Sequence, residues 1–386
     1  MKYELATLSW DENEKKAIKR VMDSDIYTMG ENVYKFEKMF ADYVGSKYAV
    51  MVNSGSSANL LMIASLMYSK EFNIKRGDEV TVPAVSWATT YTPLQQYGLK
   101  VKFIDIDINT LNFDISQLEK AVTDKTKIIL AVNLLGNPND FDAIKKIISN
   151  KDIILLEDNC EALGAVYNGK QLGTIGLIGT YSTFFSHHMA TMEGGVIVTD
   201  NEEIYNILLS LRAHGWTRQL PKNNRLCQKS DNPFEESFRF ILPGYNVRPV
   251  EMSGAIGIEQ LKKLSNFIEE RIKNAKYFIN KFKHDERFII QKEIGQSSWF
   301  GFSLIIRDNS GILRKDIINK LLNNNIEVRP IVSGNFLKNE VIKYFDYEIF
   351  DTVNNAELLD RNGFFIGNHH FDIRDKIDYF KQVIDS

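Results

Sequence analysis

The chain has 386 residues, of which 44% are apolar and 25% are charged, as in ordinary globular proteins of one or two domains. Its formal charge of −3 argues against a general attraction to nucleic acid. No stretch has the roughly 20 apolar residues of a membrane span, and we expect no signal peptide, because the first residues are acidic and mixed. Two cysteines, Cys160 and Cys227, are too few for a disulfide framework, so we expect a cytoplasmic protein.

Short apolar runs alternate with longer helical patterns over the first 250 residues. Runs of this kind, closed by turn residues or charges, are typical of buried parallel strands. Their alternation with helices predicts an α/β fold with a mainly parallel central sheet, and we assign residues 1–250 to a large domain. The predicted strands are Glu79–Pro83, Val101–Ile106, Lys127–Leu134, Ile153–Glu157, Thr180–Phe185 and Gly195–Thr199.

The pattern changes after Val250. Apolar spacing predicts a long amphipathic helix from Glu251 to Phe282. Two further strands are predicted at Phe300–Ile306 and Ile326–Pro330, with helical patterns between and after them. Residues 251–386 are therefore expected to form a smaller α+β domain.

The segment Asn53–Asn59 combines small and hydroxyl-bearing residues just before a helical run. Gly55 lets the backbone approach an anion, and the hydroxyl of Ser56 adds a donor. Free N–H groups at a helix N-terminus favour negative charge. The segment is a candidate phosphate site, although a plain helix cap uses the same residue types. It lacks the Gly-Lys-Ser/Thr ending of a Walker loop.

Acidic residues follow the predicted strand Ile153–Glu157, among them Asp158 and Glu161. Ligands of open α/β sheets bind at the carboxyl ends of the strands. An aspartate at this place can pair with a cationic ring nitrogen, and a helix cap is the alternative interpretation.

Two adjacent histidines, His187 and His188, precede a Glu-Gly-Gly turn that begins at Glu193. Adjacent side chains rarely face one metal ion, and no third ligand lies nearby in the sequence, so we expect no metal site. A structural role is expected for His188. A later loop, Pro243–Glu251, precedes the long helix and on its own is interpreted as a solvated loop.

The order and spacing of these motifs are more specific than any one of them. Trp87 follows a strand, then come the strand-end Asp158, Ser-x4-(base)-x5-Glu-Gly-Gly and Gly-Tyr-Asn-x-Arg. Over essentially the whole chain this order resembles the sugar aminotransferases of the fold-type I pyridoxal-phosphate superfamily. The resemblance implies an aspartate-aminotransferase-like fold and pyridoxal or pyridoxamine 5′-phosphate as the cofactor.

In that family a lysine bonds covalently to the cofactor, six residues before the glutamate of Glu-Gly-Gly. This chain has His187 there, which is typical of the 3-dehydratase branch. The segments that carry this closer resemblance are SHHMATMEGG, YAVMVNSGSSANLLMIA, LLEDNCEALGA and PGYNVRPVEMSGAIGIEQL. The resemblance implies removal of the C3 hydroxyl of GDP-4-keto-6-deoxy-D-mannose, on a lipopolysaccharide O-antigen route to colitose.

A related branch, the CDP-hexulose 3-dehydratases, shares this histidine but carries an iron–sulfur cluster. Such a cluster needs about four thiolate ligands. Because Cys160 and Cys227 cannot supply them, we expect no iron–sulfur cluster.

The resemblance also implies roles for individual residues. Gly55, Ser56 and Ser182 would hold the cofactor phosphate, Trp87 would stack on the ring, Asp158 would bind the ring nitrogen and Glu161 would lie near the ring. Asn246 would reach the phosphate in the neighbouring subunit, which implies a homodimer with shared active sites. The residues matched to positions near the sugar nucleotide or the amino acid are Tyr27, Thr28, His214, Arg218, Arg248 and Glu327.

Imidazole cannot form a covalent imine with the cofactor, so pyridoxamine phosphate is expected to be the working form. A neutral imidazole is a suitable base near pH 7, and we expect His187 to take a proton from the cofactor. The electrons pass to the ring while Asp158 keeps its nitrogen protonated. The expected products are the 3-deoxy ketone and ammonia, and L-glutamate would restore the amine and leave 2-oxoglutarate.

Three alternatives stay open at this point. One is an aminotransferase that uses a different lysine, although no lysine lies between Lys170 and Glu193. Another is a 3-dehydratase for a related sugar or another nucleotide. The third is a non-catalytic binding protein that kept the fold and lost the lysine.

Overall fold

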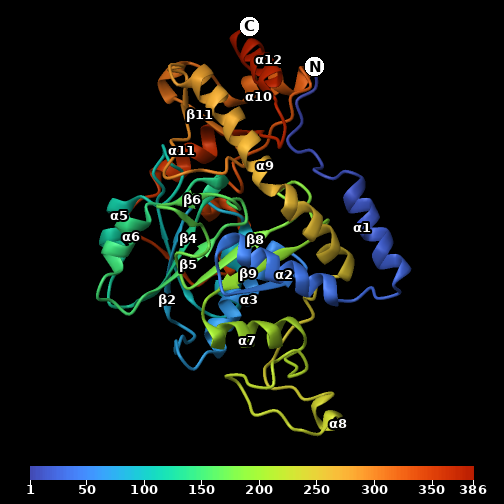
Figure 1. The fold of residues 1–386 in the computed structure, drawn as a ribbon. Helices are drawn as coiled ribbons and strands as arrows, with labels where there is room; N and C mark the ends of the chain where they lie inside the picture. Colours follow the sequence, from blue (N-terminus) through green and yellow to red (C-terminus); the bar gives the residue numbers. More distant parts are fainter.

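The computed structural model describes all 386 residues and is built around one eight-stranded sheet (Figure 1). Strand β9 pairs antiparallel with both of its neighbours, and the other neighbouring strands pair in parallel. The sheet is therefore mainly parallel, as predicted. In spatial order the strands are β1 (Tyr48–Val52), β9 (Gly195–Thr199), β8 (Ile178–Ser182), β5 (Ile154–Asp158), β4 (Thr126–Val132), β2 (Glu79–Pro83), β3 (Lys100–Ile104) and β12 (Tyr347–Ile349).

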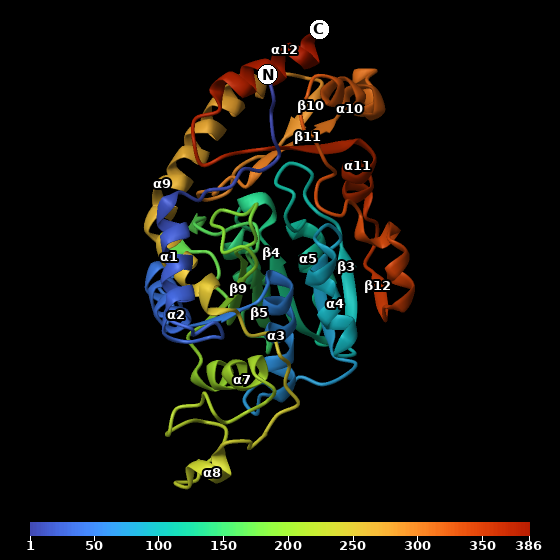
Figure 2. The same cartoon turned by 90° about the vertical axis from the view of Figure 1, so that its right-hand side faces the viewer.

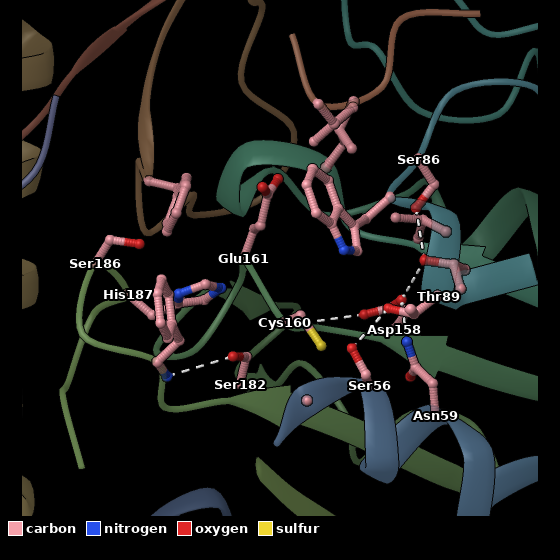
Figure 3. A pocket seen from close by; sticks show the side chains of 18 of the residues that line it. Ser56, Asn59, Ser86, Thr89, Asp158, Cys160, Glu161, Ser182, Ser186 and His187 are labelled. Carbon is pink, nitrogen blue, oxygen red and sulfur yellow. Dashed lines mark hydrogen bonds between the residues drawn. The ribbon is translucent and has the colours of Figure 1, made fainter. Parts of the chain in front are cut away.

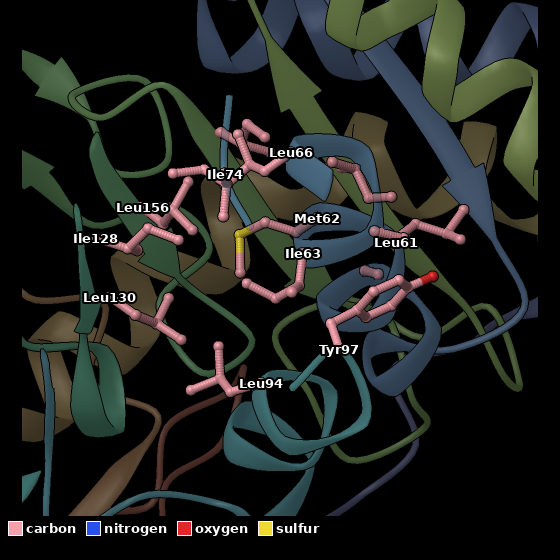
Figure 4. Packing of buried hydrophobic residues seen from close by; sticks show 14 of the residues in the cluster. Leu61, Met62, Ile63, Leu66, Ile74, Leu94, Tyr97, Ile128, Leu130 and Leu156 are labelled. Carbon is pink, nitrogen blue, oxygen red and sulfur yellow. The ribbon is translucent and has the colours of Figure 1, made fainter. Parts of the chain in front are cut away.

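Helices cover both faces of this sheet because alternate strand residues point to opposite sides. In β4, Ile128 and Leu130 belong to the cluster formed with α3 (Gly55–Tyr68), α4 (Ala88–Gln96) and α7 (Glu202–Arg212). Figure 4 shows Met62 and Ile63 of α3 lying against these strand residues. On the other face, Ile129 and Ala131 pack with α5 (Ile115–Ala121) and α6 (Phe141–Ile148).

A smaller three-stranded antiparallel sheet lies above the large sheet in the view of Figure 2. It consists of β10 (Phe288–Ile290), β11 (Gly301–Ile306) and β13 (Gly363–Gly367). Packed with it are α10 (Arg314–Asn323), α11 (Asn354–Asn362) and α12 (Arg374–Asp385). None of the helices combines the length and the apolar character that crossing a bilayer requires.

Helix α9 (Glu251–Phe282) connects the two parts. Its first half packs on α1 (Glu12–Asp23) and α2 (Glu31–Val44), and its last turns join the core of the small sheet. Two segments lie on the other side of the domain boundary predicted at residue 250. Strand β12, from the second part of the chain, extends the large sheet, and Tyr3, from the first part, lies in the core of the small sheet. The remaining short elements are β6 (Val166–Tyr167), β7 (Lys170–Gln171), α8 (Pro233–Glu236), η1 (Leu134–Gly136), η2 (Asp308–Ser310), η3 (Phe336–Lys338) and η4 (Glu340–Tyr344).

Three predicted elements, at Glu79–Pro83, Gly195–Thr199 and Glu251–Phe282, have the observed bounds. Most other predicted strands are displaced by one to three residues. The predicted strand Ile326–Pro330 is wrong, because its backbone makes only isolated bridges, from Ile326 to Tyr3 and from Arg329 to Phe365. Its pairing is divided between two partners, so no continuous ladder forms.

A buried ion pair network holds β12 on the sheet. The ammonium of Lys102 lies 2.8 Å from Glu79 and 3.2 Å from Glu348, and its side chain is 5% exposed. We expect Lys102→Met to lower the free energy of unfolding by about 3 kcal/mol or more, because it leaves the buried Glu79 without its partner. Lys100→Met is the matched control: Lys100 pairs with Glu348 but is 39% exposed, so its loss should cost under about 1 kcal/mol. Equal destabilisation of both variants in urea denaturation would contradict this account.

Candidate active site

A cavity of about 500 Å³ opens where β4, β5 and β8 end and α3 begins. Parallel strands bring their carboxyl ends to one edge of a sheet, which is where ligands of such folds bind. Its 23 lining residues come from both parts of the chain, from Ser54 at the start of α3 to Phe300 and Arg329 beside the small sheet. The volume suits a small organic cofactor.

One end of the cavity is built to receive an anion. Ser54 caps α3 by accepting a hydrogen bond from the backbone N–H of Ser57, while other N–H groups of the first turn have no intrahelical partner. The hydroxyls of Ser56 and Ser182 line the same cavity. A Cβ atom added to Gly55 would lie 2.7 Å from the Cβ of Ser182, so only glycine fits there. Backbone donors and hydroxyls thus surround the space that a phosphate would fill.

The carboxylate of Asp158 lines the cavity at the end of β5. Its Oδ2 accepts hydrogen bonds from Asn59 Nδ2 at 2.8 Å and from Thr90 Oγ1 at 2.7 Å. Its Oδ1 accepts one from the backbone N–H of Cys160 at 3.1 Å (Figure 3). A carboxylate oxygen has room for a second donor, so Oδ1 can still receive the N–H of a protonated ring.

Trp87 and Glu161 also line the cavity. The indole of Trp87 is 60% exposed in the single chain and is therefore free to stack on a ligand ring. Glu161 Oε2 accepts a hydrogen bond from the backbone N–H of Leu135 at 3.1 Å. Burial raises the pKa of Glu161 to about 7, against the opposing effect of Arg329. Glu161 is consequently divided between its acid and carboxylate forms near neutral pH.

The loop after β8 brings His187 to the cavity. β8 ends at Ser182, earlier than the predicted Phe185, because the chain turns away from the sheet there. The neighbouring His188 anchors the loop: it is buried, and its Nε2 donates a hydrogen bond to the carbonyl of Ser298 at 3.1 Å. The structural role predicted for His188 is thus confirmed.

His187 lies opposite Asp158 in Figure 3, and its Nδ1 has no hydrogen-bond partner. Its pKa is lowered to about 3, first by burial and then by the charges of Arg329 and Arg271. The imidazole is therefore neutral at physiological pH and has an unprotonated nitrogen available as a base.

The lowered pKa makes a prediction for stability. The unfolded chain protonates this histidine below about pH 6.5, whereas the folded chain does so only near pH 3. His187 therefore destabilises the folded state as the pH falls through this window. We compare the free energy of unfolding of cofactor-free His187→Asn with that of the wild type at pH 7.5 and at pH 5. The difference, variant minus wild type, should be about 2 kcal/mol larger at pH 5 than at pH 7.5. Parallel urea curves at the two pH values measure this gain, and an unchanged difference between the proteins would contradict the neutral imidazole.

Seven of the residues predicted for the site line this cavity: Gly55, Ser56, Trp87, Asp158, Glu161, Ser182 and His187.

The other predicted site residues lie outside the cavity in this chain. Glu327 accepts a hydrogen bond from the backbone N–H of Leu5 and pairs with Lys2. Thr28 bridges Val250, and Tyr27 hydrogen-bonds Asp25. Asn246 accepts a hydrogen bond from Arg248, whose guanidinium lies 5.9 Å from the Trp216 ring, and His214 packs on the same ring. Arg218 follows in the same segment. The roles assigned to these residues outside the cavity stay predictions.

The sequence prediction missed several lining residues, including Asn59, Thr90, Phe300 and Arg329. Asn59 belongs to the segment that was predicted to bind phosphate, so its place in the sequence could have indicated that it lies at the site. Arg329 lies within the predicted strand Ile326–Pro330, but no pattern in the sequence shows that this segment faces the large sheet.

Comparison with known proteins assigns the family. Residues 9–362 match the model of the DegT/DnrJ/EryC1/StrS aminotransferase family. The chain belongs to this family. A protein of Escherichia coli O55:H7 named GDP-4-keto-6-deoxy-D-mannose 3-dehydratase is 63% identical over 384 residues, 99% of each chain. A Yersinia pseudotuberculosis protein of the same name is 62% identical over 377 residues, which cover 97% of this chain and 96% of the relative.

A solved structure supports the same assignment. The E. coli GDP-4-keto-6-deoxy-D-mannose-3-dehydratase with bound hydrated PLP matches with a TM-score of 0.98 at 63% identity, over 99% of both chains. Structures under the name of this enzyme also hold a trapped PLP-glutamate geminal diamine and, in a variant, GDP-perosamine. The fold is thus that of the pyridoxal-phosphate aminotransferase-like proteins.

The cavity of this family member fits pyridoxal phosphate by its own chemistry. The α3 N-terminus and two hydroxyls match the phosphate, Asp158 Oδ1 matches the ring nitrogen, and the Trp87 indole matches the ring face. No lysine is among the lining residues, and His187 is one of them.

Proposed function

We propose that this protein is a pyridoxal-phosphate-dependent enzyme that removes the C3 hydroxyl of GDP-4-keto-6-deoxy-D-mannose. The product is GDP-4-keto-3,6-dideoxy-D-mannose. L-Glutamate serves as amino donor, and ammonia and 2-oxoglutarate are released. The identity of 63% across the whole chain to an enzyme of this name supports the substrate and the reaction class.

The observation that carries the proposal is His187 in a cavity that no lysine lines. A lysine in this position bonds to the cofactor and can return a proton to the sugar, which leads to an amino sugar. Histidine cannot form the covalent bond, so the combination that leads to an amino sugar is lost. The residue change therefore favours a cofactor held by non-covalent contacts alone and a reaction that ends in deoxygenation.

The residues of the chain then divide the work. The bound cofactor supplies an amine that captures the substrate ketone and a ring that accepts electrons. Gly55, Ser56 and Ser182 bind its phosphate, and Asp158 keeps the proton on its ring nitrogen. The neutral imidazole of His187 removes a proton from the cofactor's C4′ carbon. The imidazolium formed in this way can pass the proton to the departing C3 hydroxyl, which leaves as water.

We further propose a homodimer in which Asn246 binds the cofactor phosphate of the neighbouring subunit. In its own chain Asn246 lies away from the cavity, on a face with Trp216 and Arg248. Phe234 and Phe238 are largely exposed, as expected of residues that a second copy covers. We also propose a cytoplasmic location and a place in the formation of colitose for an O-antigen.

The test is a product analysis. Purified protein is incubated with pyridoxal phosphate, L-glutamate and GDP-4-keto-6-deoxy-D-mannose, and the sugar nucleotide is examined by mass spectrometry. We expect the loss of one oxygen at C3 and an equal amount of ammonia. A lack of turnover with this sugar, together with turnover of a CDP- or dTDP-linked keto sugar, would refute the proposed substrate.

A further inference from the structure

Three buried side chains to which the sequence assigned no role surround the carboxylate of Asp158. Asn59 comes from α3, Thr90 from α4 and Thr180 from β8, and all are at most 2% exposed. Thr180 pairs with Asp158 across the two parallel strands. Its hydroxyl donates to Asn59 Oδ1 at 2.6 Å, and the Nδ2 of the same amide donates to Asp158 at 2.8 Å. Three different elements, α3, α4 and β8, thus contribute one group each to this network.

The directions of the hydrogen bonds follow from two groups that accept, the carboxylate of Asp158 and the amide oxygen of Asn59. A carboxylate only accepts, so Thr90 must donate to Asp158 Oδ2. The oxygen of Thr90 is then free only to accept, and Ser86 must be the donor of their 2.8 Å bond. The amide of Asn59 is oriented in the same way, since its oxygen receives the Thr180 hydroxyl. The hydrogen bonds from Ser86 through Thr90 and from Thr180 through Asn59 both end at Asp158 Oδ2.

The two oxygens of Asp158 have different surroundings. Oδ2 receives the two side-chain donors, which fill its hydrogen-bonding capacity. Oδ1 receives only the backbone N–H of Cys160. The carboxylate cannot rotate without breaking two short bonds, so the oxygen with spare capacity stays directed at the cavity.

We infer that Asn59 and Thr90 are positioning residues for the cofactor: they fix Asp158 so that Oδ1 receives the proton-bearing ring nitrogen. This inference rests on the cofactor-binding role of Asp158 in the proposed function. A positioning role differs from a purely structural role in one respect. Positioning residues should affect recognition of the ring nitrogen more than recognition of the rest of the cofactor.

A pair of ligands separates these roles. Pyridoxal phosphate has the ring nitrogen, and 1-deazapyridoxal phosphate has carbon in its place. Titration of cofactor-free protein by calorimetry gives the dissociation constant of each. The wild type should prefer the nitrogen-containing ligand by about tenfold or more, the effect of one hydrogen bond to a charged group. Thr90→Val and Asn59→Ala should each reduce this preference at least about threefold, and Thr90→Ser should restore it.

Thr92→Val is the matched control. Thr92 also lies on α4, but its hydroxyl donates to the backbone carbonyl of Ala88 and takes no part in the network. This variant should keep the full preference. If Thr90→Val and Asn59→Ala keep the wild-type preference, or weaken both ligands equally, the positioning role is refuted. If the wild type itself shows no preference, or Asp158→Asn retains it, the assignment of Asp158 fails instead.

Discussion

Replacing His187 with asparagine is expected to reduce turnover by about a thousandfold while the dissociation constant of pyridoxal phosphate changes less than about threefold. General base catalysis contributes roughly 10²–10⁴ to a rate, and an amide cannot accept the proton. Asparagine fills similar space, and the phosphate, ring-nitrogen and ring-face contacts of the cavity stay in place. Steady-state kinetics and a fluorescence titration measure the two quantities.

The control for this variant is the folded structure. Circular dichroism and the melting temperature at pH 7.5 should match those of the wild type, because His187 makes no side-chain hydrogen bond through Nδ1 that the variant would lose. Turnover within tenfold of the wild type would mean that another group is the base. Loss of turnover together with loss of cofactor would show that His187 acts chiefly in binding.

Gly55→Ala is expected to weaken cofactor binding by about a hundredfold. The added methyl group would lie 2.7 Å from the Cβ of Ser182 and 3.1 Å from the Sγ of Cys160. The start of α3 must then move, and several phosphate contacts are lost together. Equilibrium dialysis of pyridoxal phosphate gives the change in affinity.

Ser56→Ala provides the comparison for Gly55→Ala. It removes one hydroxyl, which in the free protein is 2.9 Å from Thr89 Oγ1, and keeps the backbone N–H groups of the turn. Its effect should be about tenfold or less. If both variants bind the cofactor as the wild type does, the phosphate site lies elsewhere in the cavity.

The sequence predicted the parts of the fold that depend on local pattern. Buried runs such as Glu79–Pro83 and the amphipathic period of Glu251–Phe282 are visible in any short window. It did not predict β12, a three-residue strand whose pairing with β3 depends on contacts nearly 250 residues away. The error at Ile326–Pro330 has the same origin, since Tyr3 and Phe365 are distant in the sequence.

For the candidate site, seven of the predicted residues line one cavity, because the segments that carry them follow strands that end at the same edge of the sheet. The side chains that orient them were missed. Thr90 looks like any helix residue in the sequence, and its contact with Asp158 depends on the packing of α4 against the sheet. The strongly lowered pKa of His187 was not foreseen either, since it arises from burial and from Arg329 and Arg271, which are distant from His187 in the sequence.

The fate of the nitrogen of glutamate tests the central claim most directly. The enzyme is supplied with ¹⁵N-labelled L-glutamate, the cofactor and GDP-4-keto-6-deoxy-D-mannose, and the label is followed by NMR and mass spectrometry. Because His187 replaces the lysine that would direct the reaction to an amino sugar, the label should appear as ammonia, one equivalent for each 3-deoxy sugar formed. Label retained in the sugar nucleotide would mean transamination, and would contradict the role assigned to His187.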